Sequence, residues 1–240
     1  MILLFTDYGI DGPYIGQVQA VINKMAPEEP VINLLANAPR QNPKAAAYLL
    51  ASLARGYPEE TIFFCVIDPC VGTFKDIPVV LKIDDCWFVG PDNGLFDVVA
   101  GNGKKVECWE IHWRPEKLST TFHGRDLYAP ITAMIANGLD IPGERFKWQD
   151  KNQWPKDLYE IIFIDHFGNC MTGIRAGKIN NAITLRISDN QISHADTFAE
   201  VSKGQVFWYQ NSNGLIEIAV NKGNASKQLN LDIGTEVAFS

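Results

Sequence analysis

The sequence FFCVIDPCVG, residues 63–72, decides the fold class of this protein. Its first five residues are apolar at every position, which is typical of a strand that is buried on both faces. Such strands belong to parallel sheets that are sandwiched between helices. Asp68 follows the apolar run directly, and a turn with Pro69 and Gly72 comes next. The stretch therefore predicts a buried strand that ends in a carboxylate at the edge of a sheet.

Two other stretches repeat this pattern of an apolar run followed by polar turn residues. They are MILLFTDYG at 1–9 and CWFVGPDNG at 86–94. In open α/β sheets, ligands bind outside the carboxyl ends of the strands. If the three strands are parallel, Asp7, Asp68 and Asn93 converge on one crevice, and we expect a binding site there.

The composition is that of an ordinary globular protein, with 46% hydrophobic residues in 240. A net charge of −7 and a pI near 5.1 argue against nucleic acid as a partner, because phosphate binding needs clustered Lys and Arg. No apolar run approaches the ~20 residues that span a bilayer, and no charged leader precedes the first strand. We expect a cytoplasmic protein with no membrane partner. Five cysteines without a CxxC spacing favour neither a disulfide framework nor a zinc site.

The sequence divides into two predicted domains joined by a linker. Residues 1–145 alternate strands with helices, the signature of an α/β domain with a mostly parallel, helix-covered sheet. Residues 146–157 are the expected linker, a polar stretch without clean periodicity. Residues 158–240 hold short β-prone runs between Gly, Asn and Asp turns, which favours a smaller antiparallel, barrel-like domain. The helices are expected at 13–25, 43–55 and 124–137, and the C-terminal strands at 159–164, 183–187, 205–210, 215–220 and 236–239.

Candidate chemical groups gather in TFHGRD, residues 121–126, just before an apolar helical stretch. His123, Arg125 and Asp126 offer an imidazole, a guanidinium and a carboxylate, although the last two residues could form only a structural ion pair. Asp7 and Asp68 also belong to a residue type that often caps turns and helices. Their joint placement at one predicted sheet edge favours a functional interpretation.

Six motifs in a fixed order, spanning both predicted domains, carry a resemblance to one enzyme family. They are TDYG (6–9), IDPCVGT (67–73), GPDNGL (90–95), TFHGRD (121–126), DHFGN (165–169) and NSNGLIEIAVN (211–221). This order resembles the S-adenosyl-L-methionine (SAM) hydroxide adenosyltransferases, also called SAM hydrolases or the DUF62 family, which are relatives of fluorinases and chlorinases.

The resemblance implies both a reaction and an assembly. The reaction is SAM plus water giving adenosine and L-methionine, with SAM as the substrate and with no metal or cofactor. The assembly is a homotrimer whose active sites lie between one subunit's N-terminal α/β domain and a neighbour's C-terminal β-barrel-like domain. Attack at the ribose C5′ displaces a neutral thioether, so the difficult step is activating water, whose pKa is ~15.7.

The resemblance also implies a catalytic triad of aspartate, arginine and histidine. The aspartate falls on Asp68 and the histidine on His123, whereas the arginine falls on Lys75. Lysine keeps the positive charge but lacks the planar fork of five donors, and Arg125 is an alternative cation. Cys70, where the family usually has glycine, is a second departure that is strained if the backbone there needs a positive φ.

The substrate-binding residues follow from the same motifs. Asp7 matches the carboxylate that holds the ribose diol, and Asp165 and Asn169 match residues for the methionine amino group and the nucleoside. Ser212 and Asn213 match the segment that reads the adenine edges, and a tight Asn-Gly hairpin there does not conflict with binding.

Aromatic residues of the C-terminal domain complete the predicted site. Phe198, Trp208 and Tyr209 could sandwich adenine or belong to the core, where such residues more often lie. The predicted substrate-binding set is Asp7, Asn93, Asp165, Asn169, Phe198, Tyr209, Ser212 and Asn213.

Two other functions stay open at this point. In SAM-dependent halogenases, a tyrosine and a threonine stand where this chain has Asp68 and Val71, and the fluorinase has a serine where it has Gly124. A carboxylate beside the nucleophile repels halide, so hydrolysis is favoured. The other alternative is a catalytically inactive SAM- or adenosine-binding protein, which the changes at Lys75 and Cys70 permit.

Overall fold

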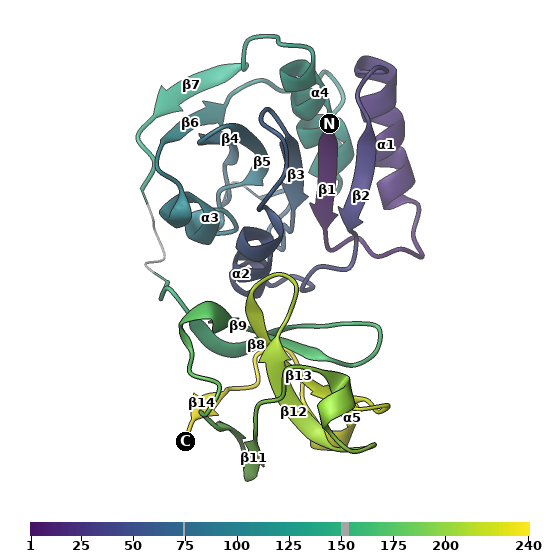
Figure 1. Ribbon diagram of the computed structural model, residues 1–240. Coiled ribbons are helices and arrows are strands. Elements are labelled where there is room, and N and C mark those ends of the chain that lie inside the picture. Colours follow the sequence, from purple (N-terminus) through teal and green to yellow (C-terminus); the bar gives the residue numbers. More distant parts are fainter. Residues whose placement is uncertain (74, 150–153) are drawn as a thin grey trace. The chain divides into compact units, whose positions relative to one another are not determined.

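The computed structural model describes residues 1–73, 75–149 and 154–240. The chain forms two compact units (Figure 1). The first comprises residues 1–50 and 54–154, and the second comprises residues 155–240 and 51–53. Part of the predicted linker, residues 150–153, lies outside the described residues. None of the helices in the described part of the chain combines the length and the apolar character needed to cross a membrane.

The first unit is built on a seven-stranded sheet with the order β2-β1-β3-β5-β4-β6-β7. The neighbours β2, β1, β3 and β5 are parallel, whereas β4, β6 and β7 add antiparallel pairings at one edge. The prediction of a mostly parallel sheet is confirmed. The strands are β1 (Ile2–Thr6), β2 (Val31–Leu35), β3 (Ile62–Val66), β4 (Pro78–Ile83), β5 (Cys86–Pro91), β6 (Val106–Ile111) and β7 (Gly143–Phe146).

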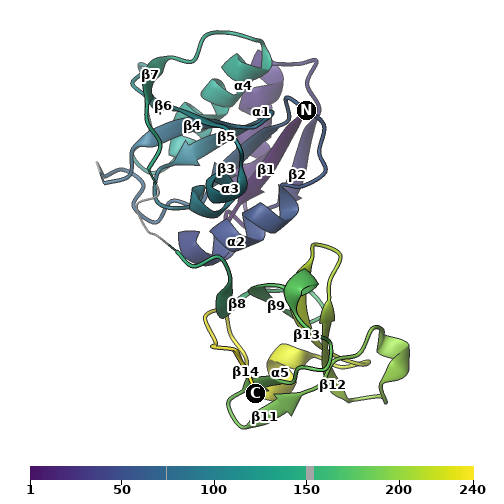
Figure 2. The same cartoon turned by 60° about the vertical axis from the view of Figure 1, so that its left-hand side comes forward.

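Strands β1 and β3 are buried along their whole length, which is why their sequences are apolar at every position. On one face, Ile2, Leu4 and Phe64 share a hydrophobic cluster with residues of helices α1 and α4. Figure 2 shows α1 and α4 on one side of the sheet and α2 and α3 on the other. The helices are α1 (Tyr14–Met25), α2 (Pro43–Leu53), α3 (Asp97–Asn102) and α4 (Ala129–Ala136).

The predicted helices are found with small differences at their ends. Helix α2 begins at Pro43, directly after Asn42, whose side chain accepts a hydrogen bond of 3.0 Å from the Ala45 N–H. The helix expected at 124–137 has two parts, a π-helical turn at Gly124–Tyr128 and then α4. The π-helical turn follows His123 directly, and such turns often occur at functional sites.

The second unit contains two antiparallel sheets, β12-β13-β9-β8 and β11-β10-β14. Its predicted antiparallel character is confirmed, and the described strands form two sheets that do not close into one barrel. Strands β9 and β11 were not predicted, because β9 follows a turn motif and contains Gly173, and β11 is short and polar. The elements are β8 (Leu158–Ile164), β9 (Cys170–Arg175), β10 (Leu185–Ile187), β11 (Asn190–Ile192), β12 (Val206–Gln210), β13 (Leu215–Val220), β14 (Ala238–Phe239) and α5 (Ala225–Leu229), with 3-10 turns at Ala176–Lys178 and Phe198–Glu200.

Candidate active site

The carboxyl ends of β1 and β3 bring two carboxylates to one cavity. The strands are parallel neighbours, with Thr6 opposite Val66, so the residues that follow them, Asp7 and Asp68, leave the sheet at the same edge. Both line a cavity of about 60 Å³. His123 lines the same cavity from the turn before the π-helix. Three segments far apart in the sequence therefore meet here.

Asn93, which follows strand β5, contacts the end of strand β3, where Asp68 lies. Its side-chain amide donates a hydrogen bond of 2.8 Å to the Ile67 carbonyl, and its oxygen accepts one of 3.3 Å from the Leu95 N–H. Strands β3 and β5 are parallel, as the convergence argument required. Asn93 is not among the residues that line the cavity, and its contacts fix the backbone beside Asp68.

The surroundings of Asp68 favour its protonated form. Burial raises the pKa of this carboxyl to about 6, with further contributions from the charges of Asp76 and Asp7. One hydrogen bond opposes the shift, a bond of 3.1 Å that Asp68 accepts from the Cys70 N–H. Burial also raises the pKa of Asp7, against a hydrogen bond of 2.9 Å from the Gln41 N–H. A carboxyl that titrates close to neutral pH is suited to accept and release a proton.

His123 is held towards its neutral form. Burial lowers its pKa first and the positive charge of Arg114 lowers it further, whereas Asp126 acts in the opposite direction. A neutral imidazole offers one acceptor nitrogen and one donor N–H. It is therefore able to take a proton or to orient a water molecule.

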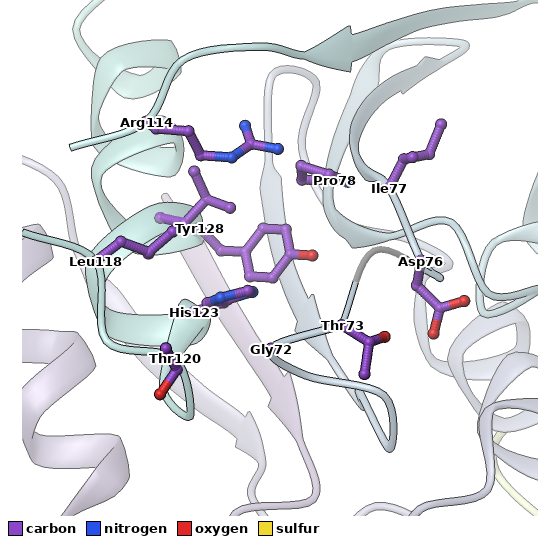
Figure 3. A pocket seen from close by; sticks show the side chains of 11 residues that line it. Gly72, Thr73, Asp76, Ile77, Pro78, Arg114, Leu118, Thr120, His123 and Tyr128 are labelled. Carbon is purple, nitrogen blue, oxygen red and sulfur yellow. The ribbon is translucent and has the colours of Figure 1, made fainter.

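A second cavity, of about 250 Å³, shares His123 with the first. Figure 3 shows Arg114, His123 and Tyr128 on one side of it and Thr73 and Asp76 on the other. The Arg114 guanidinium donates hydrogen bonds of 2.8 Å to the carbonyls of Ile111 and Trp113, which hold it in place. Arg114 lies outside the six motifs, so no sequence pattern connects it with His123.

The other predicted cations have different surroundings. Lys75 is exposed and lines neither cavity. Arg125 donates to both carboxylate oxygens of Asp126, at 2.6 and 2.9 Å, and donates to the Gln17 side chain. The structural ion pair of Arg125 with Asp126, which is one interpretation of the TFHGRD motif, is therefore present. In the turn that follows Asp68, the residue with a positive φ is Gly72 and not Cys70. The condition for backbone strain at the cysteine is therefore not met.

The second unit has its own cavity, of about 590 Å³. Five of the predicted binding residues line it: Asp165, Asn169, Phe198, Tyr209 and Ser212. Asp165 accepts hydrogen bonds from the N–H groups of Phe167 and Asn169 and from the Asn169 side chain, at 2.8 to 3.0 Å.

The two remaining candidates of the second unit do not line this cavity. The N–H of Asn213 donates to the Asn211 side chain. Trp208 belongs to the hydrophobic core, with 1% of its surface exposed, and its indole N–H donates to the Ile183 carbonyl.

Glu217 is a candidate site residue that the motifs do not predict. It lines the cavity of the second unit, and only 3% of its surface is exposed. Its carboxylate accepts hydrogen bonds from the Tyr209 hydroxyl and from the Asn211 amide, the latter at 2.8 Å. The available signal was a single acidic residue inside the apolar strand LIEIAV.

Comparison with known proteins establishes the family. Profiles described as the SAM hydroxide adenosyltransferase N-terminal domain and C-terminal domain match residues 2–143 and 159–238. The chain belongs to the SAM hydroxide adenosyltransferase family, as the six motifs indicated.

Individual relatives agree with this assignment over nearly the whole chain. Proteins named (R)-S-adenosyl-L-methionine hydrolase are 29% identical in Thermus thermophilus, over 98% of each chain, and 30% identical in Methanocaldococcus jannaschii, over 99% of this chain and 94% of that one. A fluorinase from Nocardia brasiliensis is 22% identical, over 99% and 95%. A crystal structure described as an uncharacterized conserved protein from Thermotoga maritima has a TM-score of 0.89 and 31% identity, covering 100% of this chain and 99% of that one.

Gly124 has a packing reason to lack a side chain. A Cβ atom at this position would overlap with the Tyr8 hydroxyl, which is buried and has no hydrogen-bond partner among the described residues. We expect Gly124→Ala to destabilise the protein by about 1–3 kcal/mol through overpacking. Adding Tyr8→Phe should restore part of this loss, because it removes the overlapping oxygen and leaves the ring carbon Cζ at 3.0 Å from the new Cβ. Urea unfolding measures both effects.

Gly16→Ala, in helix α1, is the matched control, because a Cβ atom there meets nothing within 4 Å. It should leave the stability unchanged or slightly higher, since alanine favours a helix interior over glycine. Equal stability of Gly124→Ala and the wild type would contradict the packing argument.

The raised pKa of Asp68 predicts a cost to stability at neutral pH. The unfolded chain has the ordinary value of 3.8 and the folded protein about 6, so the stability that the protonated group contributes is present below pH 4 and lost as the pH rises through 6. Asp68→Asn removes this loss. We expect it to melt at a higher temperature than the wild type at pH 8, with a difference that shrinks below pH 6 and vanishes below pH 4. Thermal melts from pH 3.5 to 8 measure it, and a constant difference would contradict the assignment.

Proposed function

We propose that this protein hydrolyses SAM to adenosine and L-methionine. The main support is that Asp7, Asp68 and His123 line one cavity at the carboxyl ends of two parallel strands. The chain also belongs to the SAM hydroxide adenosyltransferase family. The names of the relatives from Thermus thermophilus and Methanocaldococcus jannaschii support the choice of substrate.

The proposed reaction is a displacement at the ribose C5′. The oxygen of water forms a bond to C5′ while the bond from C5′ to sulfur breaks, and its electron pair stays on sulfur. The sulfonium becomes a neutral thioether, so the leaving group needs no proton and the proposal includes no metal or cofactor. One proton of the water is released, and it passes to a base and then to solvent. The protein's task is therefore to activate and aim the water.

Asp68 and His123 are the proposed groups for that task. Above its pKa of about 6, the Asp68 carboxylate accepts the proton of the attacking water. The neutral imidazole of His123 orients this water through its acceptor nitrogen or its N–H. Lys75 is the proposed cation of the triad, on the resemblance to the family.

Substrate binding is proposed for both parts of the chain. In residues 1–145, Asp7 accepts hydrogen bonds from the ribose hydroxyls, and Asn93 supports the strand end next to the site. In residues 158–240, polar side chains hold the methionine amino group and the nucleoside, and aromatic rings flank adenine. This second group comprises Asp165, Asn169, Phe198, Tyr209, Ser212 and Asn213.

Incubation of pure protein with SAM, followed by chromatography for adenosine, tests the proposal. We expect adenosine from the wild type and a loss of at least a hundredfold in turnover for Asp68→Ala and His123→Ala, in the range of general-base contributions. Lys75→Ala should lower turnover less, since this side chain is exposed. Asp85→Asn, an exposed carboxylate outside both cavities, is the control and should match the wild type.

The pH dependence adds an independent check. Turnover should rise as the pH increases through about 6, because Asp68 must be ionised to act as a base. Both sulfonium epimers are assayed, since the names of the relatives specify the R form. Formation of 5′-halo-adenosine in the presence of chloride or fluoride would favour the halogenase alternative, and binding of SAM without any product would favour the inactive one.

We also propose a homotrimer with active sites at its subunit interfaces, on the resemblance to the family. Light scattering on purified protein should then give a mass three times that of the 26.8 kDa chain. A mass equal to that of the single chain would contradict this assembly.

A further inference from the structure

Glu217 is a buried acid in the middle of a strand that is otherwise apolar. All six residues of β13 are buried, and the exposed fraction of Glu217 is 3%. Burying a carboxylate is unfavourable unless hydrogen bonds compensate for the lost hydration. Both oxygens are engaged here, Oε1 by the Tyr209 hydroxyl and Oε2 by the Asn211 amide.

The first of these bonds determines where the Tyr209 ring stands. Tyr209 lies directly opposite Glu217 in the antiparallel pairing of β12 with β13, so both side chains extend from the same face of the sheet. The ring lines the cavity of the second unit and packs edge-on against Phe198, with 5.6 Å between the ring centres. With the hydroxyl tied to the carboxylate, this aromatic wall is fixed before any ligand arrives.

The second bond fixes a turn at the same cavity. Asn211 donates to Glu217 through its side-chain nitrogen and accepts from the N–H groups of Asn213 and Leu215 through its side-chain oxygen, each at 3.0 Å. Ser212, inside this turn, lines the cavity. One carboxylate thus holds an aromatic ring and a polar turn in a single arrangement.

We propose that Glu217 is the positioning residue of the nucleobase subsite. It fixes Tyr209 as a stacking surface and the turn 211–215 as a polar edge, so that a purine meets groups already in place. This inference rests on the proposed function, which supplies the adenosyl group. Binding to preorganised groups is tighter because less conformational freedom is lost on association, and aromatic rings stack well on bases.

Two substitutions of different severity test the proposal. Glu217→Leu removes the acceptor of both donors, and we expect about a tenfold rise in the KM for SAM and in the Kd for adenosine, with kcat within about twofold of the wild type. A tenfold change corresponds to about 1.4 kcal/mol. Glu217→Gln should raise both values only about two- to threefold, because the Tyr209 hydroxyl is able to accept from the new amide while Asn211 still donates to its oxygen.

The control is Glu236→Gln, an exposed acid of the same unit that lies outside this cavity. It removes the same charge and should leave both constants unchanged. Melting temperatures of all variants show whether they fold. If Glu217→Leu does not fold, the proposal is tested by comparing Glu217→Gln with Glu236→Gln. A two- to threefold rise in KM and Kd for Glu217→Gln alone supports it, and equal constants in the two variants contradict it.

A double substitution separates positioning from a general loss of structure. Tyr209→Phe removes the hydroxyl that Glu217 holds, so in the background of Glu217→Leu it should weaken adenosine binding by less than it does in the wild type. Isothermal titration with adenosine measures this coupling. If the two substitutions act independently, the rise in the Kd for adenosine in the double variant equals the product of the two single rises. That result would overturn the proposed connection between Glu217 and Tyr209.

Failure of this inference is distinguishable from failure of the proposed function. If the wild type binds adenosine but forms none from SAM, the hydrolysis proposal fails and the binding constants still test Glu217. Wild-type affinity for adenosine in both Glu217 variants would overturn the positioning role. A fall in kcat at unchanged KM, or a wild type that binds no adenosine, would overturn it too.

Discussion

The burial of the Asp68 carboxylate at the end of β3 is the constraint on which the candidate site depends. Burial raises the pKa of Asp68 to about 6, and the charges of Asp76 and of Asp7, which the neighbouring parallel strand brings to the same edge, add to the rise. A carboxyl in ordinary solvent is too weak a base to activate water efficiently, so the unfavourable position is what makes the group useful. The rest of the unit holds the acid in this position. Both faces of β3 are packed, and the Asn93 side-chain amide donates a hydrogen bond to the carbonyl of Ile67, the residue before Asp68.

The imidazole of His123 is brought to this acid by packing of a different kind. The π-helical turn at Gly124–Tyr128 begins next to it, and Gly124 approaches the Tyr8 hydroxyl so closely that no side chain fits between them. Tyr8 is the neighbour of Asp7 in sequence, so this contact joins the segment that carries the imidazole to the segment that carries one of the acids. In fluorinases, by the family resemblance, a serine occupies the place of Gly124. The overlap with Tyr8 shows that the side chain of such a serine would not fit at this position of the chain.

Much of this arrangement follows from local sequence patterns, and the rest does not, for physical reasons. Continuous apolar runs predict the buried strands β1, β3 and β5, and the polar residues after them predict the sheet edge where Asp7 and Asp68 lie, because strand direction and side-chain burial are encoded within a few residues. Arg114 lines the same cavity as His123 because the chain returns to this cavity after β6. That two residues of different segments line one cavity is not predicted by a local sequence pattern. The role of Glu217 is missed for a different reason. Its apolar neighbours predict its strand correctly, but its partners lie on β12 and in the turn that follows it. The motif resemblance implies that Lys75 belongs to the triad, but its side chain is exposed in the structure. The exposure of a side chain depends on the packing of the whole unit, which a short motif does not encode.

Two acids, the partly buried Asp68 and the fully buried Glu217, show how hydrogen-bond partners decide the role of a carboxyl group. Burial raises the pKa of both carboxyls. The Asp68 carboxylate accepts a hydrogen bond from the backbone N–H of Cys70, which leaves capacity on its oxygens for a water molecule. Both oxygens of Glu217 accept from side chains that line the walls of the other cavity, and these bonds act against the rise in its pKa. The first acid is therefore left available for chemistry. The second is committed to holding its neighbours, because moving it would leave two buried donors without an acceptor.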